Sequence, residues 1–245
     1  SLVGSEMCIR DRIYSALKSY SRNFEKLASG SRLNKAGDGA AEIAVTNLLK
    51  ADLVSSNQGI RNIWNGISLL QTAEGSLDAV SKNLTRMKEL AAQAGNDIYS
   101  PEQKRLMQQE FDQLNSQNVQ IGQMVNFNGI RLHRDNQIIT VTGEEQEFAI
   151  QTKSIPSISA GLSDCKTAAT SVEDAIAYVN AYRGALGGHM TSLVQGANLL
   201  AKKAEEILIC ESRIADIDAA SAAASMTADE VLLQQAVASH THNKS

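Results

Sequence analysis

The feature that most constrains this chain is a sustained spacing of apolar residues, with steps that alternate between three and four positions. Between residues 60 and 94, eleven apolar side chains follow one another at a mean step of 3.4 residues. From Val172 to Ile214 the same register continues over six heptads, which corresponds to a helix about 63 Å long. A step near 3.5 residues is typical of helices that bury one stripe against other helices. These segments therefore predict long rods packed in a bundle.

Capping signatures indicate where helices should begin. Ser100, Pro101 and Gln103 stand in the order of N-cap, first helical residue and capping-box partner. Thr170 and Glu173 repeat the capping-box spacing before the C-terminal rod. Together with the apolar stripes, these signals predict long helices over residues 60–94, 101–125 and 172–217.

The centre of the chain has the pattern of short strands. Residues 138–142 and 148–152 favour strands, with a hairpin loop at 143–147, and residues 126–129 favour a turn. The sequence therefore predicts a mainly α fold. It would be a long antiparallel helical bundle or coiled coil, built from the N- and C-terminal halves, with a small β-hairpin region. The predicted bundle core consists of these apolar positions: Ile63, Leu70, Leu77, Leu84, Leu114, Leu186, Leu193, Leu200 and Ile207.

Three glycines interrupt the predicted C-terminal rod, at Gly184, Gly187 and Gly188. A glycine inside a helix costs about 1 kcal/mol relative to alanine. The glycines mark either a close contact with another helix or a weak point in the rod. The sequence gives these two interpretations equal weight.

Composition and charge exclude several classes of protein. The formal net charge of −4 argues against nucleic-acid binding, and no apolar run reaches the roughly 18 residues of a membrane span. Cys8, Cys165 and Cys210 are scattered, so they indicate neither a disulfide framework nor a zinc site. His240 and His242 have no third metal ligand nearby in the sequence.

Signatures of catalysis are missing from the sequence. It contains no phosphate-binding, dinucleotide-binding, nucleophile-elbow or zinc-protease motif. Glu144, Glu145 and Glu147 fall in the predicted hairpin loop, where solvated carboxylates are the simpler interpretation. We therefore expect no catalytic residues, no metal site and no cofactor, and we do not expect an enzyme.

The two ends depart from the pattern of the middle. Residues 1–12 (SLVGSEMCIRDR) fit neither the heptads nor the composition that follows, and they lack the apolar region of a secretory signal. We interpret them as a non-native leader. Residues 240–245 (HTHNKS) break the apolar pattern, and we interpret them as a disordered or spliced tail.

Four separated strings resemble bacterial flagellin, and they occur in the order of that family. They are residues 27–41 (LASGSRLNKAGDGAA), 65–93 (NGISLLQTAEGSLDAVSKNLTRMKELAAQ), 127–132 (FNGIRL) and 211–236 (ESRIADIDAASAAASMTADEVLLQQA). Because the segment between the two halves is short, the chain resembles a minimal flagellin that lacks large outer domains.

The resemblance implies a domain organisation. Residues 13–40 and 219–245 correspond to a partial inner domain, which the family builds from both termini. Residues 41–132 and 171–218 correspond to the helical rod domain, and residues 133–170 would form a short β-hairpin and loop insert. Because both ends differ here from the family pattern, we expect a folded middle but poor filament formation.

The resemblance also implies a function, namely a structural subunit of the bacterial flagellar filament that self-assembles into a helical propeller for motility. It would be secreted by flagellar type III export, without a cleaved signal peptide, to the extracellular flagellum. Its partners would be other subunits, the flagellar export chaperone, the cap proteins and the flagellin-sensing Toll-like receptor of animals. The receptor-binding residues of the family correspond to Arg86, Leu90 and Glu110.

Two alternatives would use similar heptads. One is a flagellin-like hook–filament junction protein, against which the strength of the match over residues 65–93 argues. The other is a helical-bundle binding module such as an export chaperone, which would not require four flagellin strings in order.

Overall fold

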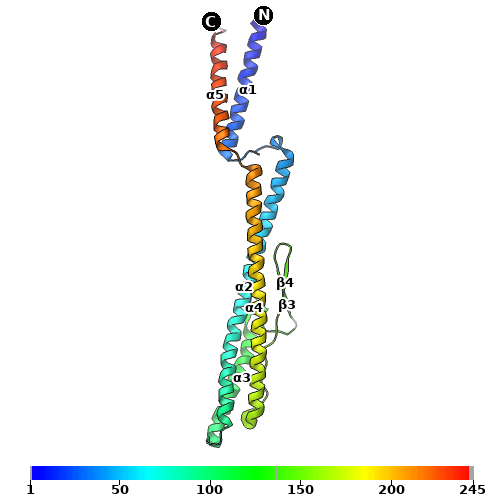
Figure 1. The fold of residues 1–245 in the computed structure, drawn as a ribbon, viewed down its shortest axis with the longest axis vertical. Helices are drawn as coiled ribbons and strands as arrows, with labels where there is room; N and C mark the ends of the chain where they lie inside the picture. Colours follow the sequence, from blue (N-terminus) through cyan, green and yellow to red (C-terminus); the bar gives the residue numbers. More distant parts are fainter. Residues whose placement is uncertain (1, 136, 243–245) are drawn as a thin grey trace. The chain divides into compact units, whose positions relative to one another are not determined.

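The computed structural model describes residues 2–135 and 137–242 and is dominated by long helices, as the sequence predicts (Figure 1). The chain divides into two compact units, one formed by Ser55–Lys202 and the other by Ser1–Val54 together with Lys203–Ser245. The elements in chain order are α1 (Leu2–Ser29), η1 (Ala36–Asp38), α2 (Ala40–Ala94), α3 (Pro101–Met124), β1 (Asn126–Phe127), β2 (Ile130–Arg131), β3 (Ile138–Thr142), β4 (Glu147–Gln151), η2 (Leu162–Asp164), α4 (Cys165–Ala215) and α5 (Ala219–His242).

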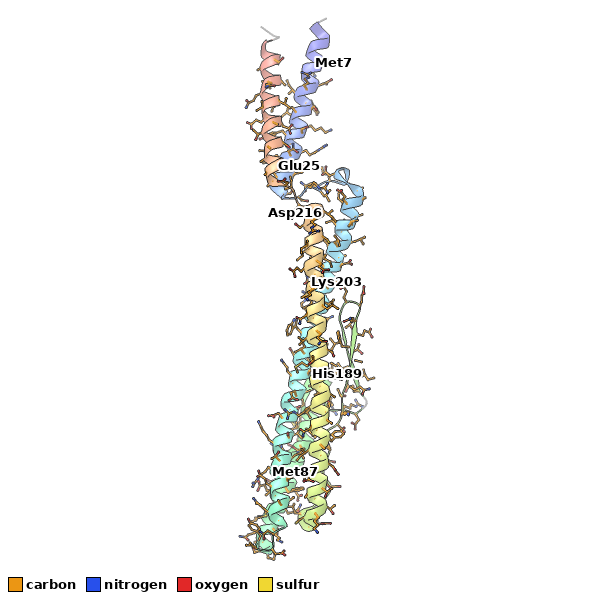
Figure 2. The ribbon with its side chains drawn as sticks, viewed as in Figure 1. Met7, Glu25, Met87, His189, Lys203 and Asp216 are labelled. Atoms are coloured by element: carbon orange, nitrogen blue, oxygen red, sulfur yellow. The ribbon has the colours of Figure 1, made fainter. Side chains whose placement is uncertain are left out.

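The unit Ser55–Lys202 is held together by an apolar core that α2, α3 and α4 share, and Figure 1 shows these helices side by side. Phe111 on α3 and Tyr182 on α4 are the largest side chains that are fully buried there. Met87, labelled in Figure 2, lies in the same core. The heptad positions predicted for this core that are buried are Ile63, Leu70, Leu77, Leu84, Leu186 and Leu193.

Three of the positions predicted for the core lie elsewhere or are less covered. Leu114 and Leu200 are half-buried and pack against the edge of the core. Leu200 lies under the tip of the β3–β4 hairpin, beside Gly143. Ile207 is buried, but it belongs to the other unit and not to the core of the bundle. A heptad register predicts which face of a helix is apolar, but it does not predict how far along that face the neighbouring helices and strands extend.

The helix starts agree with the predictions at α3 and differ at α2 and α4, since α2 begins at Ala40 and not near residue 60. At α3, Ser100 Oγ accepts a hydrogen bond from Gln103 N at 3.3 Å, and Gln103 Oε1 accepts one from Ser100 N at 2.9 Å. The predicted capping box is therefore confirmed. The predicted start of α4 at Thr170 is wrong, because Thr170 lies inside the helix and donates to Lys166 O. Asp164 supplies the acceptors at the true start, through bonds from Thr167 N and Thr167 Oγ1.

Replacing Ser100 by alanine should lower the free energy of unfolding by about 1 kcal/mol, because the N–H of Gln103 loses its acceptor. Urea unfolding of the full chain, followed by circular dichroism, measures the change. Thr85→Ala is the matched control, since that exposed hydroxyl donates to a carbonyl of its own helix. The control should change stability by less than about 0.5 kcal/mol. Equal losses in both variants would contradict the role of the cap.

The strands lie close to their predicted places. β3 and β4 pair antiparallel, with Ile138 opposite Gln151 and Thr142 opposite Glu147. The predicted turn at residues 126–129 carries the small β1–β2 pair around Asn128 and Gly129, with φ values of 49° and 82°. Positive φ at both central residues is the geometry that Asn-Gly favours in tight hairpins.

Glycines on the rod allow the β3–β4 hairpin to lie close to it. A Cβ atom at Gly59 on α2 would stand 2.9 Å from Glu144 N, and one at Gly66 would stand 2.8 Å from Val141 Cγ2. Gly184, Gly187 and Gly188 differ, because a Cβ atom there would meet nothing within 4 Å among the described atoms. Within the described chain, the second group therefore does not mark a close helix contact.

The unit formed by Ser1–Val54 and Lys203–Ser245 contains the pair of α1 and α5, which lie side by side (Figure 1). Asn23 Nδ2 on α1 donates to Asp229 Oδ2 on α5 at 2.7 Å. α1 begins at Leu2, so it includes most of the segment interpreted as a leader, whose origin stays a prediction. Of the segment interpreted as a tail, residues 243–245 lie outside the described residues.

Candidate functional site

A cluster of charged side chains joins α2 to α3. Arg86 Nε lies 2.7 Å from Glu110 Oε1, and Arg86 Nη2 lies 3.2 Å from Glu110 Oε2. Arg86 Nη1 also contacts Glu89 Oε2 at 3.1 Å. These carboxylates raise the pKa of the Arg86 guanidinium above its ordinary value. The side chains of Arg86 and Glu110 are 43% and 45% exposed, so the pair presents both charges to solvent.

Leu90 lies one turn beyond Arg86 but has a different environment. Its side chain is 1% exposed and belongs to the core of the unit Ser55–Lys202. The structure therefore brings Arg86 and Glu110 together at the surface and places Leu90 beneath them. A partner that approaches this surface would meet the ion pair and not the leucine.

A second ion pair, between α4 and α2, was missed by the sequence reasoning. Arg183 donates to Glu74 through Nε at 3.0 Å and through Nη2 at 2.6 Å, and Nη2 lies 3.6 Å from Asp78 Oδ1. Arg183 occupies a heptad position that would ordinarily be apolar. A charged residue in a predicted seam was the signal that could have revealed this pair. The pair favours one register between the two helices.

The insert is also attached to the rod by polar contacts. Ser56 on α2 is fully buried and donates to Glu144 Oε2 at 2.7 Å. The prediction that Glu144 is solvated is therefore wrong, because the tip of the hairpin lies against α2. On α3, the Asn115 amide pairs with both the N–H and the C=O of Ile158.

A groove of about 540 Å³ lies between α1 and α5. Arg12, Ser15, Asp229, Leu232 and Gln235 are among the residues that line it. Among the side chains described in α1 and α5, none is buried. Their large exposed apolar residues are Met7, Tyr14, Leu17, Phe24, Val231, Leu232 and Val237. A helix pair of this kind leaves much of its apolar surface in water.

The two connections that lead to α1 and α5 are hydrogen-bonded to each other. Arg32 N donates to Ala215 O at 2.7 Å, and Arg32 Nη2 donates to Ile214 O at 2.9 Å. Ile217 N donates to Gly30 O at 3.2 Å. The two bonds from Arg32 satisfy carbonyl groups that the end of α4 leaves free, and the bond from Ile217 satisfies one just after the end of α1. The connections at residues 30–39 and 216–218, which interrupt the α-helices, are therefore joined to each other by hydrogen bonds.

Cysteines and other possible metal ligands lie apart in the described part of the chain. Among its side chains, no three from His, Cys, Asp and Glu gather as metal ligands would. Cys165 and Cys210 are free thiols. No helix within residues 2–135 and 137–242 is both long and apolar enough to cross a membrane.

Comparison with known families shows to which family this chain belongs. The family model for the bacterial flagellin N-terminal helical region matches residues 4–137, and the model for the C-terminal helical region matches residues 169–241. The chain belongs to the bacterial flagellin family. A flagellin is a structural protein, and this one is a subunit of the bacterial flagellar filament, outside the cell.

Relatives of this flagellin match along most of its length. It is 31% identical over 224 residues to a flagellin of Halalkalibacterium halodurans, covering 86% of this chain and 82% of the relative. It is 30% identical over 251 residues to flagellin FlaB2 of Treponema pallidum, covering 90% and 87%. The flagellar filament 33 kDa core protein of Treponema phagedenis matches with the same identity and coverage.

Solved structures agree with the fold of this flagellin. The crystal structure of Bacillus cereus flagellin superposes with a TM-score of 0.53 at 25% identity, covering 57% of this chain and 88% of that chain. A putative flagellar hook-associated protein from Vibrio parahaemolyticus superposes with a TM-score of 0.66 at 12% identity, covering 73% and 100%. The second likeness shows the fold alone.

Proposed function

We propose that this flagellin joins the filament through α1 and α5, whose exposed apolar side chains become covered by neighbouring copies. The observation that carries the proposal is that no side chain described in this helix pair is buried. A helix pair without a core gains little stability from itself, because terminal helices depend on packing for most of their stability. Assembly would supply that packing, so the pair would become more ordered as subunits join.

Replacing Leu232 by glutamate tests this proposal. Leu232 is 55% exposed and lines the groove between α1 and α5. A buried leucine contributes about 1.5–3 kcal/mol, so a charge at this position should raise the subunit concentration needed for polymerisation by at least tenfold. Sedimentation of polymer and electron microscopy of the full chain measure the effect, relative to the concentration at which the unchanged chain polymerises. We expect that concentration to be high, because both ends differ from the family pattern.

Gln234→Glu is the matched control, since it adds the same charge at an exposed polar position of the same helix. It should polymerise as the unchanged chain does. The thermal unfolding of the unit Ser55–Lys202 should be the same in both variants. Equal polymerisation by the two variants would contradict the proposed role of α5.

The wider partners belong to this proposal as well. Family membership and the four flagellin strings support export through the flagellar type III apparatus, and they support contacts with an export chaperone and the filament cap. They favour the domain division at 13–40 with 219–245, 41–132 with 171–218, and 133–170. The backbone breaks at residues 30–39 and 216–218 lie beside two of these boundaries. A role at the hook–filament junction is the second candidate, because a flagellin-like junction protein would use similar heptads.

Recognition by the flagellin-sensing Toll-like receptor would depend on Arg86 and Glu110, the exposed pair. Removing an arginine at the centre of an interface costs about 2 kcal/mol or more, so Arg86→Ala should weaken receptor signalling by roughly 30-fold. Leu90→Ala should act differently, by lowering the stability of the bundle, because Leu90 is buried. Receptor reporter assays with folded variants separate the two effects. Signalling by Arg86→Ala equal to that of the unchanged chain would refute the proposal.

A further inference from the structure

A buried histidine lies where the chain leaves β2 and enters the insert. His133 is 6% exposed, and its Nε2 lies 2.6 Å from Ser76 Oγ on α2. Its ring meets the ring of Tyr182 on α4 edge to face, with 6.0 Å between the ring centroids. The hydroxyl of Tyr182 donates to Leu132 O at 3.3 Å. Residues 132 and 133 are therefore held between α2 and α4.

The hydrogen bonds around His133 define which ring nitrogen carries the proton. The hydroxyl of Ser76 has a single hydrogen, and it donates that hydrogen to Ala73 O at 2.6 Å. The contact with His133 therefore has Nε2–H as donor and Ser76 Oγ as acceptor. Nδ1 is then the unprotonated nitrogen of a neutral ring. It is buried, and it has no hydrogen-bond partner among the described residues.

Protonation of Nδ1 would place a positive charge and an unpaired N–H inside the protein. Both are costly in a buried site. Burial accordingly lowers the pKa of His133 from its ordinary 6.5 to about 4. Release of residue 133 from the rod would let water solvate the ring and restore its ordinary pKa. Acid therefore favours any state in which this residue has left its site.

The charged groups around the site do not offset this effect as the pH falls. Glu74 and Asp78 on α2 are paired with Arg183 on α4. On the insert, Asp135 accepts from Ser154, and Lys153 lies over the ring of Tyr178 on α4. The hydrogen bond from Lys82 lowers the pKa of Asp78, and the hydrogen bonds from Ser154 lower the pKa of Asp135, so both carboxylates favour the charged form.

Movement of His133 out of its site would affect the β3–β4 hairpin through hydrogen bonds at the base of the hairpin. Thr152, which follows β4, is 4% exposed. Its N–H donates to Gln137 O at 3.0 Å, and its Oγ1 donates to Arg134 O at 2.5 Å. Arg134 is bonded directly to His133 in the chain. A movement of residue 133 therefore disturbs the hydrogen bonds at the base of the hairpin, which add to the contacts that its tip makes with Ser56 and Gly59.

We propose that His133 is an acid-sensitive latch, whose protonation at Nδ1 frees the β3–β4 hairpin from α2 and α4 while the helices remain folded. The closed state holds the ring neutral between Ser76 and Tyr182. The open state takes up a proton. The window for this exchange lies between the closed-state pKa and the ordinary value, that is, between about pH 4 and 6.5.

Hydrogen exchange of the full chain, corrected for the intrinsic effect of pH, tests the latch. In the open state His133 binds a proton over this window and in the closed state it does not, so lower pH shifts the equilibrium toward opening. Protection of the amides in β3 and β4 should fall by about two orders of magnitude between pH 7 and pH 4. Amides in α2 between residues 60 and 94 should stay protected.

Two variants complete the experiment. His133→Gln can still donate to Ser76 but cannot become charged, so hairpin protection should no longer depend on pH. His189→Gln, at the half-buried histidine labelled on α4 in Figure 2, should keep the pH dependence of the unchanged chain. NMR titration of the His133 ring supplies a measurement that does not depend on any variant folding.

Several outcomes would overturn the latch. These are hairpin protection that does not change with pH, an equal fall in His133→Gln, or loss of protection in α2 together with the hairpin. A His133 ring that titrates near pH 6.5 in the unchanged chain would overturn it as well. Loss of hairpin protection in the unchanged chain and in His189→Gln, but not in His133→Gln, supports it.

Discussion

Replacing Leu77 by alanine is expected to lower the free energy of unfolding of the unit Ser55–Lys202 by about 2–5 kcal/mol. Leu77 is fully buried on α2, in the core that α3 and α4 share. Truncation removes apolar contacts and leaves a cavity, because long packed helices cannot collapse fully around one missing side chain. Urea unfolding of the full chain, followed by circular dichroism, gives the change in midpoint.

Leu106→Ala is the matched control for Leu77→Ala. Leu106 lies on α3 and is 54% exposed, so its truncation should change stability by less than about 0.5 kcal/mol. The slope of the free energy against urea should be the same for both variants, which would show that the unfolded states are comparable. An unchanged midpoint for Leu77→Ala would mean that the heptads face away from the core.

The heptad pattern was sufficient to predict the rods, for a physical reason. A stripe with a mean step near 3.5 residues is typically buried against other helices, so the pattern predicts both the helix and the face that it buries. The pattern predicts most of α2 and α4, with α2 ending at Ala94 as predicted and α4 ending at Ala215, but α2 begins at Ala40 and not near residue 60. The capping box at Ser100 is equally local, because its donors and acceptors lie within four residues.

Contacts between distant segments could not be predicted in this way. Glu144 looked solvated in its loop, yet Ser56 donates to it across 88 positions of sequence. Thr170 carries a capping signature, but Asp164 provides the cap because the helix begins five residues earlier. For Glu144 the outcome depends on which segments meet, and spacing along one segment carries no information about that. The start of α4 is set by a local contact between Asp164 and Thr167, which the capping signature at Thr170 obscured.

The candidate receptor-binding residues also include some that the sequence predicted correctly and one whose environment it could not predict. The resemblance to flagellin pointed to Arg86 and Glu110, and the structure joins them as an ion pair. Spacing grouped Leu90 with Arg86 on one helix face, because residues four apart are neighbours. The side chain of Leu90 nevertheless enters the core. Residues on one helix face can be exposed or buried where that face borders the core. Only the packed structure therefore distinguishes an exposed residue such as Arg86 from a buried one such as Leu90.

Replacing Gly59 by alanine should destabilise the protein, although alanine is the better helix former. In an open helix position the change from glycine to alanine stabilises by about 1 kcal/mol. At Gly59, however, the new Cβ atom would stand 2.9 Å from Glu144 N and 3.1 Å from Gly143 C. Both are backbone atoms of the hairpin tip and cannot rotate away. Overpacking of this kind costs about 1–3 kcal/mol, so the net effect should be a loss.

Gly75→Ala supplies the matched control on the same helix, since its Cβ atom would meet nothing within 4 Å among the described atoms. It should raise the unfolding midpoint, whereas Gly59→Ala should lower it and reduce hydrogen-exchange protection in β3 and β4. Both variants gain the same helix propensity, so opposite changes in the unfolding midpoint would show the effect of the steric clash at Gly59. If Gly59→Ala stabilised the protein as much as Gly75→Ala, the hairpin tip would not lie on α2. The hydrogen bond from Ser56 to Glu144 would then not form, because it needs the hairpin tip to lie against α2.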